Sequence, residues 1–320
     1  MSLRLGLLST VDINAKLVAG AREADEVDVV VVASRDAGRA RAHADELEIP
    51  HALDSYEELL EDPEIDAVYI SLPNGMHVDW SVRALNAGKH VLCEKPVSRF
   101  PEAVERAFDA AERNQRVLAE AFMWRHHPQA LRLRELAGEL GELRLVRGAF
   151  SFPLVGDPGN IRLAADLEGG ALMDVGCYCV SDVRFLLGEP AEVLAHSREE
   201  TVDVRFAATM RFDSGALAHF DCGFDMPFRD ELEVVGAEGS LFLDDPWHSR
   251  TPVIERRALD GGVENVEVEA ADPYGCELVD FARACAGEAE HPFGRQDAVS
   301  QARTIAALYD SAGSGRAVSP

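Results

Sequence analysis

The chain has 320 residues, 47% of them hydrophobic and 28% charged, with a formal net charge of −26. This length predicts about two domains in a soluble globular protein, and the negative charge opposes any nucleic-acid role. The sequence has no apolar run of the roughly 18 residues that a membrane span needs and no signal pattern, so we expect a cytoplasmic protein without a membrane partner.

Apolar strands alternate with helical patterns through the first third of the chain. A nearly continuous run of valines at 27–33 is typical of a parallel strand buried on both faces. The repetition predicts a doubly wound parallel sheet. In chain order we expect strands at 3–8, 27–33, 56–60, 67–72, 91–93 and 117–122, and helices at 13–22, 37–47, 77–87 and 101–114.

From about residue 143 the pattern changes to one typical of an antiparallel sheet. Apolar and polar residues alternate over 202–212, a turn follows at 213–215, and a partner strand returns over 216–222. Strands at 231–235 and 240–243 continue this sheet, and helices at 276–286 and 298–312 close the chain. The predicted fold class is α/β, with an N-terminal parallel sheet and a C-terminal α+β domain whose open sheet is mostly antiparallel.

The turn after the first strand lacks the glycines of a G-x-G-x-x-G dinucleotide fingerprint. Its hydroxyl groups and the N–H groups of the next helix still suit a pyrophosphate. The alternative is an ordinary turn in which Ser9 or Asp12 caps the helix, and this segment alone does not separate the two. The candidate cofactor contacts in the turn are Ser9, Thr10, Val11, Asp12 and Ile13.

The second strand is followed by Ser34-Arg35-Asp36. An acid near this position usually binds the ribose hydroxyls of NAD, whereas Arg35 with Ser34 suits the 2′-phosphate of NADP. Asp36 can instead cap the helix that starts at Ala37, with Arg35 in solvent, and both arrangements can hold at once. We therefore predict NADP as the cofactor, with NAD as the alternative.

The fourth strand ends at a short polar segment on the predicted ligand-binding edge. Pro73 and a following glycine stop the strand, which places Leu72, Pro73 and Asn74 at its carboxyl end. His77 is a candidate contact to the cofactor ribose. A single histidine at a helix start is more often structural, so only its place on this edge supports the functional interpretation.

The fifth strand ends in Glu94-Lys95-Pro96. Proline has no N–H group and disfavours a helical conformation in the residue before it, so the ladder stops with Lys95 extended. In an open parallel sheet this carboxyl edge is where ligands bind. Lys95 is therefore a candidate to hold a proton or a hydroxyl group against a cofactor.

Four segments together resemble the Gfo/Idh/MocA family, the relatives of glucose–fructose oxidoreductase and inositol dehydrogenase. They are Pro73-Asn74-x-x-His77, Glu94-Lys95-Pro96, Glu120-Ala121-Phe122-Met123-Trp124-Arg125 with Pro128, and Gly169-Gly170-Ala171-Leu172-Met173-Asp174-Val175-Gly176-Cys177-Tyr178. The resemblance implies a Rossmann domain over 1–122 and a substrate-binding, oligomerisation domain over 123–320. It also implies an NAD(P)-dependent oxidoreductase acting on a sugar or polyol, assembled as a homodimer or homotetramer through the C-terminal sheet.

Asp174 and Tyr178 are four residues apart, which would place them on one face of a helix. Because free tyrosine has a pKa of about 10, a tyrosine that exchanges a proton at neutral pH needs a nearby cation such as Lys95. We expect Tyr178 to exchange the hydroxyl proton, Lys95 to polarise the oxygen and Asp174 to bind a sugar hydroxyl. Without Lys95, a core tyrosine and a helix-start acid would be the better interpretations.

Many family members carry histidine at the position of Tyr178. The tyrosine form resembles the branch that contains dimeric dihydrodiol dehydrogenases, xylose dehydrogenases and sugar ketoreductases. Arg162 and one histidine of the pair at 126–127, here His127, are expected to line the substrate side, while Glu94, Lys95 and Arg125 join the cofactor contacts. No metal is predicted, since no ligand spacing is found. The alternatives are a non-catalytic NAD(P)-sensing regulator and glycoside hydrolysis through transient oxidation.

Overall fold

The computed structural model describes residues 2–154 and 159–320, which divide into two compact units. The first comprises Met1–Ser98, Glu102–Met123 and Asp272–Val299, and the second comprises Arg99–Pro101, Trp124–Ala271 and Ser300–Pro320. The expected domain boundary at 122 lies beside the change of unit after Met123. Residues 272–299, expected in the second domain, group with the first unit instead.

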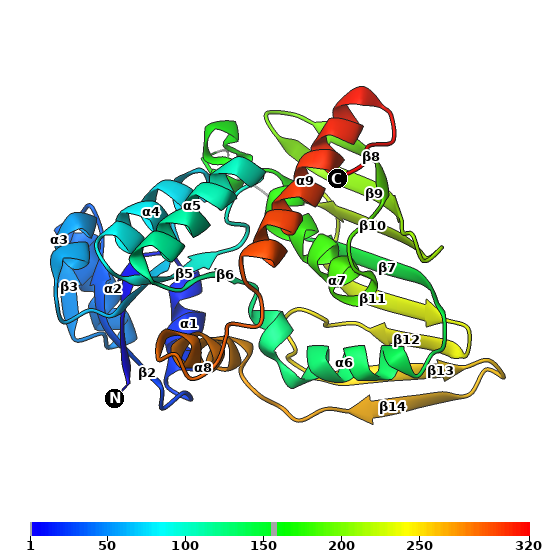
Figure 1. Cartoon of the computed structure of the whole chain (residues 1–320), viewed down its shortest axis with the longest axis horizontal. Helices are drawn as coiled ribbons and strands as arrows, with labels where there is room; N and C mark the ends of the chain where they lie inside the picture. The colour runs from blue at the N-terminus through cyan, green and yellow to red at the C-terminus, as the bar shows by residue number, and fades with distance from the viewer. Residues whose placement is uncertain (1, 155–158) are drawn as a thin grey trace. The chain divides into compact units, whose positions relative to one another are not determined.

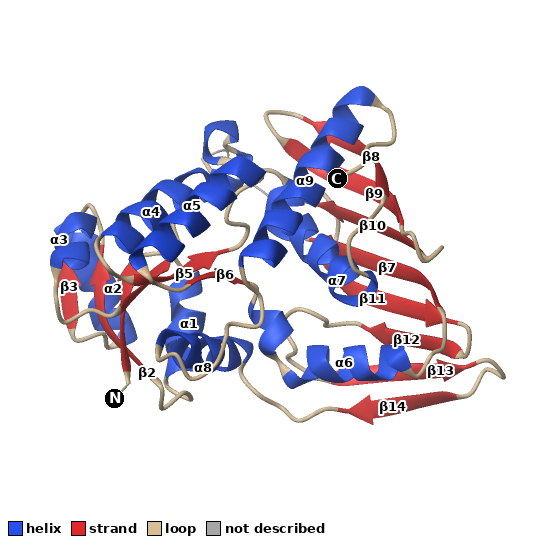
Figure 2. Ribbon diagram, in the orientation of Figure 1, coloured by secondary structure: helices blue, strands red, loops and turns tan. Residues whose placement is uncertain are grey.

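The first unit contains a parallel sheet of six strands in the order β3-β2-β1-β4-β5-β6, which confirms the doubly wound sheet (Figures 1 and 2). The order reverses at β1, so the carboxyl ends of β1 and β4 flank the point where open α/β sheets bind ligands. The elements are β1 (Leu3–Leu8), α1 (Ile13–Ala21), β2 (Val27–Ala33), α2 (Ala37–Leu47), β3 (His51–Leu53), α3 (Tyr56–Glu61), β4 (Ala67–Ile70), α4 (His77–Asn86), β5 (His90–Glu94), α5 (Pro101–Asn114) and β6 (Leu118–Ala121).

The third strand lies earlier in the chain than the sequence pattern predicted. The segment expected as a strand at 56–60 is the helix α3, and the strand is the short β3. Ser55 caps this helix, because its Oγ accepts a hydrogen bond of 3.2 Å from the Glu58 N–H. The buried Leu59 and Leu60 therefore pack from a helix rather than a strand.

The helix α8 (Pro273–Cys285) is distant in sequence but belongs to the first unit, where it contacts α1. Its start is capped by Asp272, whose Oδ1 accepts the Gly275 N–H at 2.9 Å. A Cβ added at Gly20 of α1 would lie 2.5 Å from the Gly275 nitrogen and 2.8 Å from the Tyr274 Cβ. Glycine at position 20 is thus required for the close approach of the two helices.

The second unit contains eight strands in the order β14-β13-β12-β11-β7-β10-β9-β8. Only β7 and β10 pair in parallel among these neighbours, which confirms the mostly antiparallel sheet. The elements are α6 (Pro128–Gly138), β7 (Leu143–Ser151), α7 (Cys177–Leu187), β8 (Glu192–Glu199), β9 (Asp203–Arg211), β10 (Leu217–Gly223), β11 (Arg229–Gly236), β12 (Gly239–Leu243), β13 (Val253–Ala258), β14 (Val263–Glu267) and α9 (Arg295–Ser314), whose first turn lies in the first unit.

One face of this second sheet forms the core and the other is open. Along β9, Val204, Phe206, Ala208 and Met210 are buried while the residues between them are exposed. The helix α7 contacts β7, and α6 contacts β12 and β13, on the covered face (Figure 2). The core of this unit therefore lies between the sheet and these helices.

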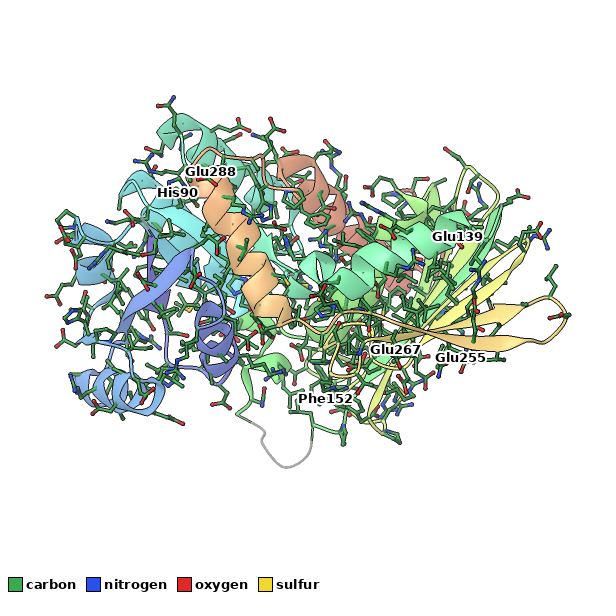
Figure 3. All side chains as sticks on the ribbon, turned by 90° about the horizontal axis from the view of Figure 1, so that it is seen from below. His90, Glu139, Phe152, Glu255, Glu267 and Glu288 are labelled. Atoms are coloured by element: carbon green, nitrogen blue, oxygen red, sulfur yellow. The ribbon has the colours of Figure 1, made fainter. Side chains whose placement is uncertain are left out.

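Acidic side chains are spread over the surface of the second unit. Glu139 after α6, Glu255 on β13 and Glu267 on β14 are examples (Figure 3). Some pair locally, as in the 3.0 Å contact between Glu139 and Arg256. Such exposed pairs contribute little stability. Among the described helices, none has the length and apolar composition to cross a membrane.

Candidate active site

The turn between β1 and α1 is held by a buried network of small polar side chains. Ser9 has a φ of 141°, a conformation usually given to glycine. The Ser9 and Ser71 hydroxyls lie 2.8 Å apart, and Asn14 donates to the Ser9 carbonyl at 2.8 Å and accepts from Ser71 at 2.8 Å. Asp12 makes no side-chain cap at α1. The turn is therefore a fixed loop at the end of β1, and the helix-capping alternative at Asp12 does not occur.

The end of β2 presents positive charge beside the phenol of Tyr56. The carboxylate of Asp36 accepts the Arg39 N–H at 2.8 Å and so caps α2, which is the helix-capping role predicted for it. Burial raises the pKa of Tyr56, and the adjacent Arg35 and Arg39 act against that rise. Two exposed guanidinium groups next to an already engaged carboxylate fit a 2′-phosphate better than a ribose diol. Arg39 was missed in the sequence, although it lies only four residues after Arg35.

The structure gives His77 a different role from the expected ribose contact. The side chain is fully buried, with Nδ1 3.0 Å from the Pro96 carbonyl and Nε2 2.7 Å from the Leu72 carbonyl. Burial lowers its pKa to about 4, so at neutral pH the ring carries one proton and donates to one of the two carbonyls. His77 is thus a brace between the ends of β4 and β5. Pro73 and Asn74 beside it are partly exposed.

Lys95 follows β5 directly and is partly exposed. The Lys95–Pro96 peptide is cis. The backbone N–H of Lys95 lies 3.2 Å from Glu94 Oε2, while the buried Tyr69 hydroxyl donates to Glu94 Oε1. Two residues later, the Val97 N–H donates to Glu120 Oε1 at 2.9 Å. The backbone around Lys95 is thus held by carboxylates, which orients the lysine at the carboxyl end of the strand.

In the second unit, Asp174 lies on a π-helical turn, Leu172–Gly176, that runs directly into α7 with Tyr178 in its first turn. Asp174 and Tyr178 therefore lie on one continuous helical segment, whose first part is π-helical rather than α-helical, and their position on one face stays a prediction. Gly176 permits the turn to pack on the sheet, since a Cβ there would lie 2.7 Å from the Cys222 Sγ. Turns of this kind are frequent at functional sites.

A buried carboxylate anchors the start of the π-turn. Asp203 Oδ2 accepts the Leu172 N–H at 2.7 Å, and Oδ1 accepts the Tyr309 hydroxyl at 2.9 Å. Burial raises the pKa of Asp203 to about 6. Gly170 has a φ of 124°, and a Cβ there would overlap Asp203 Oδ1. The glycine pair therefore allows the chain to pass over the carboxylate before the turn begins.

Two residues expected on the substrate side are brought together. Arg162 Nε donates to Asp174 Oδ2 at 2.7 Å, and the Asp174 side chain is 18% exposed against 42% for Arg162. Asn160 supports this arrangement by accepting the Arg162 N–H at 3.0 Å. The ion pair orients a partly exposed carboxylate close to the start of α7.

His127 is not placed for substrate binding, contrary to expectation. It is fully buried and caps α6, with Nδ1 accepting the Gln129 N–H at 3.0 Å and Nε2 3.1 Å from the Ala271 carbonyl. Arg125 is buried in the second unit, where its charge opposes the raised pKa that burial imposes on Asp182. The cofactor contact predicted for Arg125 stays a prediction.

The ring of Tyr178 lies against two aromatic residues that the sequence did not single out. Its centroid is 5.6 Å from that of Phe150 on β7 and 5.9 Å from that of Trp247 after β12. Phe150 and Trp247 stack at 4.7 Å with an interplanar angle of 9°. No local signal marks these two residues, because they meet Tyr178 only when the sheet and helix pack.

Residues 12–122 match the profile of the oxidoreductase family with an NAD-binding Rossmann fold, and residues 129–242 match the C-terminal domain of the Gfo/Idh/MocA proteins. The chain is 42% identical over 319 residues to a D-xylose 1-dehydrogenase (NADP(+)) of Haloferax volcanii, covering 98% of both. The chain belongs to the Gfo/Idh/MocA oxidoreductase family. The resemblance predicted from four motifs is thereby confirmed.

Other members of the Gfo/Idh/MocA family match with similar completeness. A trans-1,2-dihydrobenzene-1,2-diol dehydrogenase of Danio rerio is 34% identical, covering 86% of this chain and 82% of its own. The crystal structure of KijD10, a 3-ketoreductase from Actinomadura kijaniata in complex with NADP and TDP-benzene, matches with a TM-score of 0.91 and 30% identity, over 97% of this chain and 98% of its own. The tyrosine at position 178 is thus found in a chain similar to dehydrogenases and a ketoreductase.

Proposed function

We propose that the protein is an NADP-dependent dehydrogenase or reductase that transfers a hydride between the nicotinamide and a CH–OH or carbonyl carbon of a sugar. The observation that carries the proposal is that a chain 42% identical to an NADP-dependent xylose dehydrogenase places Lys95 at the carboxyl end of β5. Lysine at this edge of a doubly wound sheet is positioned for ligand chemistry.

The residues at the carboxyl ends of the strands suit NADP. Arg35 and Arg39 would hold the 2′-phosphate, and the fixed turn at 9–13 with the start of α1 would hold the pyrophosphate. The further contacts proposed are Ser34, Leu72, Pro73, Asn74, Glu94 and Arg125. The bound nicotinamide supplies the hydride acceptor or donor.

The protein's own groups would handle the proton and orient the substrate. Tyr178 exchanges the proton of the reacting hydroxyl, and Lys95 polarises the same oxygen and stabilises negative charge on it. Asp174, oriented by Arg162, accepts a hydrogen bond from a second hydroxyl.

The open face of the second sheet would join copies of the chain in a homodimer or homotetramer. Leu217 on β10 and Leu194 on β8 are 52% and 37% exposed on strands of that sheet. A sheet face that carries exposed leucines suits association with a second copy. Light scattering on the purified protein measures the assembly, and a monomer would contradict it. A cytoplasmic location remains part of the proposal.

The proposed reaction is tested by following nicotinamide absorbance with a panel of aldoses and NADP⁺, and with keto sugars and NADPH. We expect turnover with at least one sugar and a preference for NADP over NAD. Tight cofactor binding without turnover on any sugar would favour the NAD(P)-sensing regulator. Cleavage of a glycoside without net cofactor reduction would favour hydrolysis through transient oxidation.

A further inference from the structure

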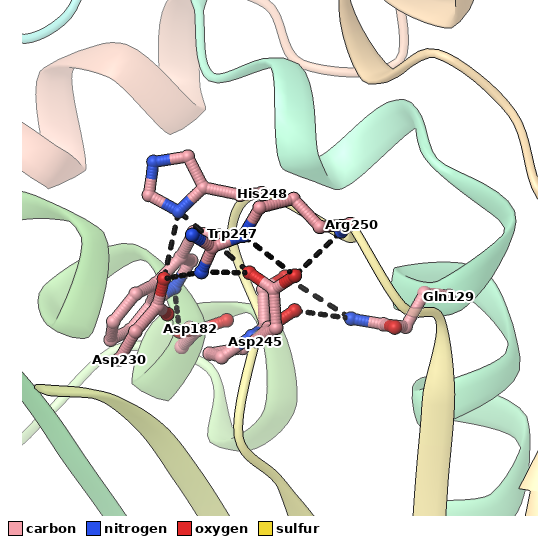
Figure 4. A network of polar contacts seen from close by, with 8 residues as sticks. Gln129, Asp182, Asp230, Asp245, Trp247, His248 and Arg250 are labelled. Carbon is pink, nitrogen blue, oxygen red and sulfur yellow. Dashed lines mark hydrogen bonds and ion pairs between the residues drawn. The ribbon is translucent and has the colours of Figure 1, made fainter.

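The loop between β12 and β13 carries a cluster of charged side chains in the second unit. We define the loop cluster as Asp230 of β11 together with Asp245, His248 and Arg250 of the loop (Figure 4). His248 Nδ1 lies 2.7 Å from Asp230 Oδ2, and Asp230 is 2% exposed. None of these residues was singled out in the sequence, and the proposed reaction does not use them.

A divalent cation is the first ligand to consider for the loop cluster. One ligand atom each from Asp230, Asp245 and His248 lie within 4.8 Å of one another. The guanidinium of Arg250, however, already supplies a positive charge there, with Nη2 3.1 Å from Asp245 Oδ1 and 3.5 Å from Asp230 Oδ2. Because arginine keeps its proton in proteins, this charge would repel a metal ion.

Asp245 forms a close ion pair with Arg250. The Arg250 Nε lies 3.1 Å from Asp245 Oδ2, and the Arg250 backbone N–H also donates to that oxygen. Burial alone would raise the pKa of Asp245, but the hydrogen bonds and charge of Arg250 hold that pKa below its usual range. The carboxylate of Asp245 is therefore already paired with a cation of the chain, and the carboxylate of Asp230 holds His248.

Asp230 determines which way the imidazole of His248 is presented. Because Nδ1 faces a carboxylate oxygen, Nδ1 carries a proton and donates to Asp230, which directs Nε2 away from that carboxylate. Nε2 lies on the side of the ring away from the carboxylates (Figure 4). The His248 side chain is 25% exposed, so it is accessible to a ligand.

A series of aromatic contacts, mostly between buried rings, connects His248 to Tyr178. The His248 ring lies edge-on to Phe150 at 5.9 Å, and Phe150 in turn contacts Tyr178 at 5.6 Å. Trp247 stacks on Phe150 and is held in place because its indole N–H donates to Asp182 of α7, the helix that carries Tyr178. His248 and Tyr178 thus flank one buried aromatic cluster, and the ring of each lies beside the ring of Phe150.

We propose that His248 is a substrate-binding residue whose Nε2 binds a hydroxyl of the sugar that reacts at Tyr178. The inference rests on the proposed function, because it takes the reacting hydroxyl to meet Tyr178. A sugar carries hydroxyls on successive carbons, so a molecule engaged at Tyr178 has others to offer to His248, whose ring contacts the same Phe150. His248 then selects which sugars bind productively.

Two amide variants test the contributions of the two ring nitrogens of His248 separately. His248→Gln keeps a polar group near the position of Nε2, whereas His248→Asn keeps the bond to Asp230 and loses the group at Nε2. We expect His248→Asn to lower kcat/KM for the preferred aldose about 10-fold, the loss of one hydrogen bond, with NADPH affinity and thermal unfolding unchanged. His248→Gln should retain most of the activity.

Single-deoxy analogues of the preferred aldose give the decisive readout. The wild-type protein should discriminate about 10-fold against the analogue that lacks the hydroxyl bound by His248, and His248→Asn should lose that discrimination for this analogue only. A purely structural role would lower activity on all analogues alike. If His248→Asn does not fold, His248→Phe replaces it in the same comparison.

The outcomes distinguish this inference from the proposed function. Wild-type turnover combined with an unchanged analogue profile in the His248 variants would overturn the inference alone. Absence of wild-type turnover on every sugar would overturn the proposed function itself. Addition of EDTA, Mg²⁺ or Zn²⁺ should leave kcat/KM unchanged, and a metal-dependent KM that His248→Asn abolishes would show a cation site instead.

Discussion

The carboxylate of Asp203 accepts the backbone N–H of Leu172 at 2.7 Å and so anchors the π-turn on which Asp174 lies. The anchor comes from β9 and reaches the turn from a part of the chain 31 residues away in sequence. A hydrogen bond from a distant strand therefore anchors the segment that carries Asp174, and the Asp203 carboxyl that accepts this bond has a pKa of about 6.

The free energy of unfolding should depend on the charge of Asp203. Burial raises its pKa to about 6 from 3.8, so the folded state favours the protonated form. The protonated Asp203 carboxyl therefore contributes fully to stability below its pKa in the unfolded chain. This contribution is lost as pH rises through about 6, its pKa in the folded protein. Between pH 5 and pH 7, the free energy of unfolding of the wild type should fall by about 1 kcal/mol more than that of Asp203→Asn. Urea denaturation at the two pH values measures both changes. Identical pH dependence in both proteins would show that Asp203 does not titrate there.

Gly170 should be far less tolerant of substitution than another glycine with positive φ. At Gly170 a Cβ would overlap Asp203, whereas at Gly215, with a φ of 90°, nothing lies within 4 Å of the added atom. Gly215→Ala tests backbone strain alone and should cost about 1 kcal/mol. Gly170→Ala adds the overlap and should cost about 3 kcal/mol or more. Thermal unfolding of the two variants checks the difference, and equal losses would mean that the turn relaxes freely.

Lys95 is expected to serve the reaction rather than the binding of the cofactor. Lys95→Ala should lower kcat by about 100-fold or more, in the range expected for loss of an acid–base group, with NADPH affinity nearly unchanged. Arg113→Ala, on the exposed surface of α5, is the control and should behave as the wild type. The measurement is kcat with NADPH titrated by fluorescence, and unchanged turnover would contradict the assignment.

If Lys95 and Tyr178 act together in one proton transfer, the effects of their substitutions on kcat should not be additive. Tyr178→Phe should lower kcat by about 100-fold or more and keep the ring contacts with Phe150 and Trp247. The double variant should be no slower than the slower single variant, as for groups that act together. A double variant whose loss equals the product of the two would show that they act separately.

Arg35 is expected to determine the choice of nicotinamide cofactor. Arg35→Ala should weaken NADPH binding about 10-fold or more while leaving NADH binding nearly unchanged, because only the 2′-phosphate loses a charged partner. Arg39→Ala should shift the ratio in the same direction. Dissociation constants for both cofactors test this, and a parallel loss of both would mean that the arginines support the loop rather than the phosphate.

Asp174 is expected to bind substrate. Asp174→Asn should raise KM for the sugar about 10-fold with little effect on NADPH affinity, because a carboxylate accepts a hydroxyl hydrogen bond more strongly than an amide does. Asp166, exposed on the preceding segment, offers a control in Asp166→Asn. A fall in kcat with KM unchanged would instead place Asp174 in the chemical step.

Local patterns in the sequence were enough to predict the sheet types, most strand and helix positions, the family and the location of Lys95. Valine runs, period-two alternation and the stop at Lys95-Pro96 depend on neighbouring residues, so they can be recognised without a structure. The sequence pattern predicts a strand at 56–60 where the structure has α3, because only the structure shows that the Ser55 hydroxyl accepts the Glu58 N–H and caps a helix.

Contacts between distant segments were decided only by the tertiary structure. His77 and His127 became buried braces because carbonyl groups from other segments meet their ring nitrogens. The π-turn depends on Gly176 fitting against Cys222, and the surface around Tyr178 depends on Phe150 and Trp247 packing across a sheet. Sequence by itself determined which residue types stand at strand ends, because chain geometry is local. Which of them face a ligand was decided by packing and burial, which involve residues far apart in the chain.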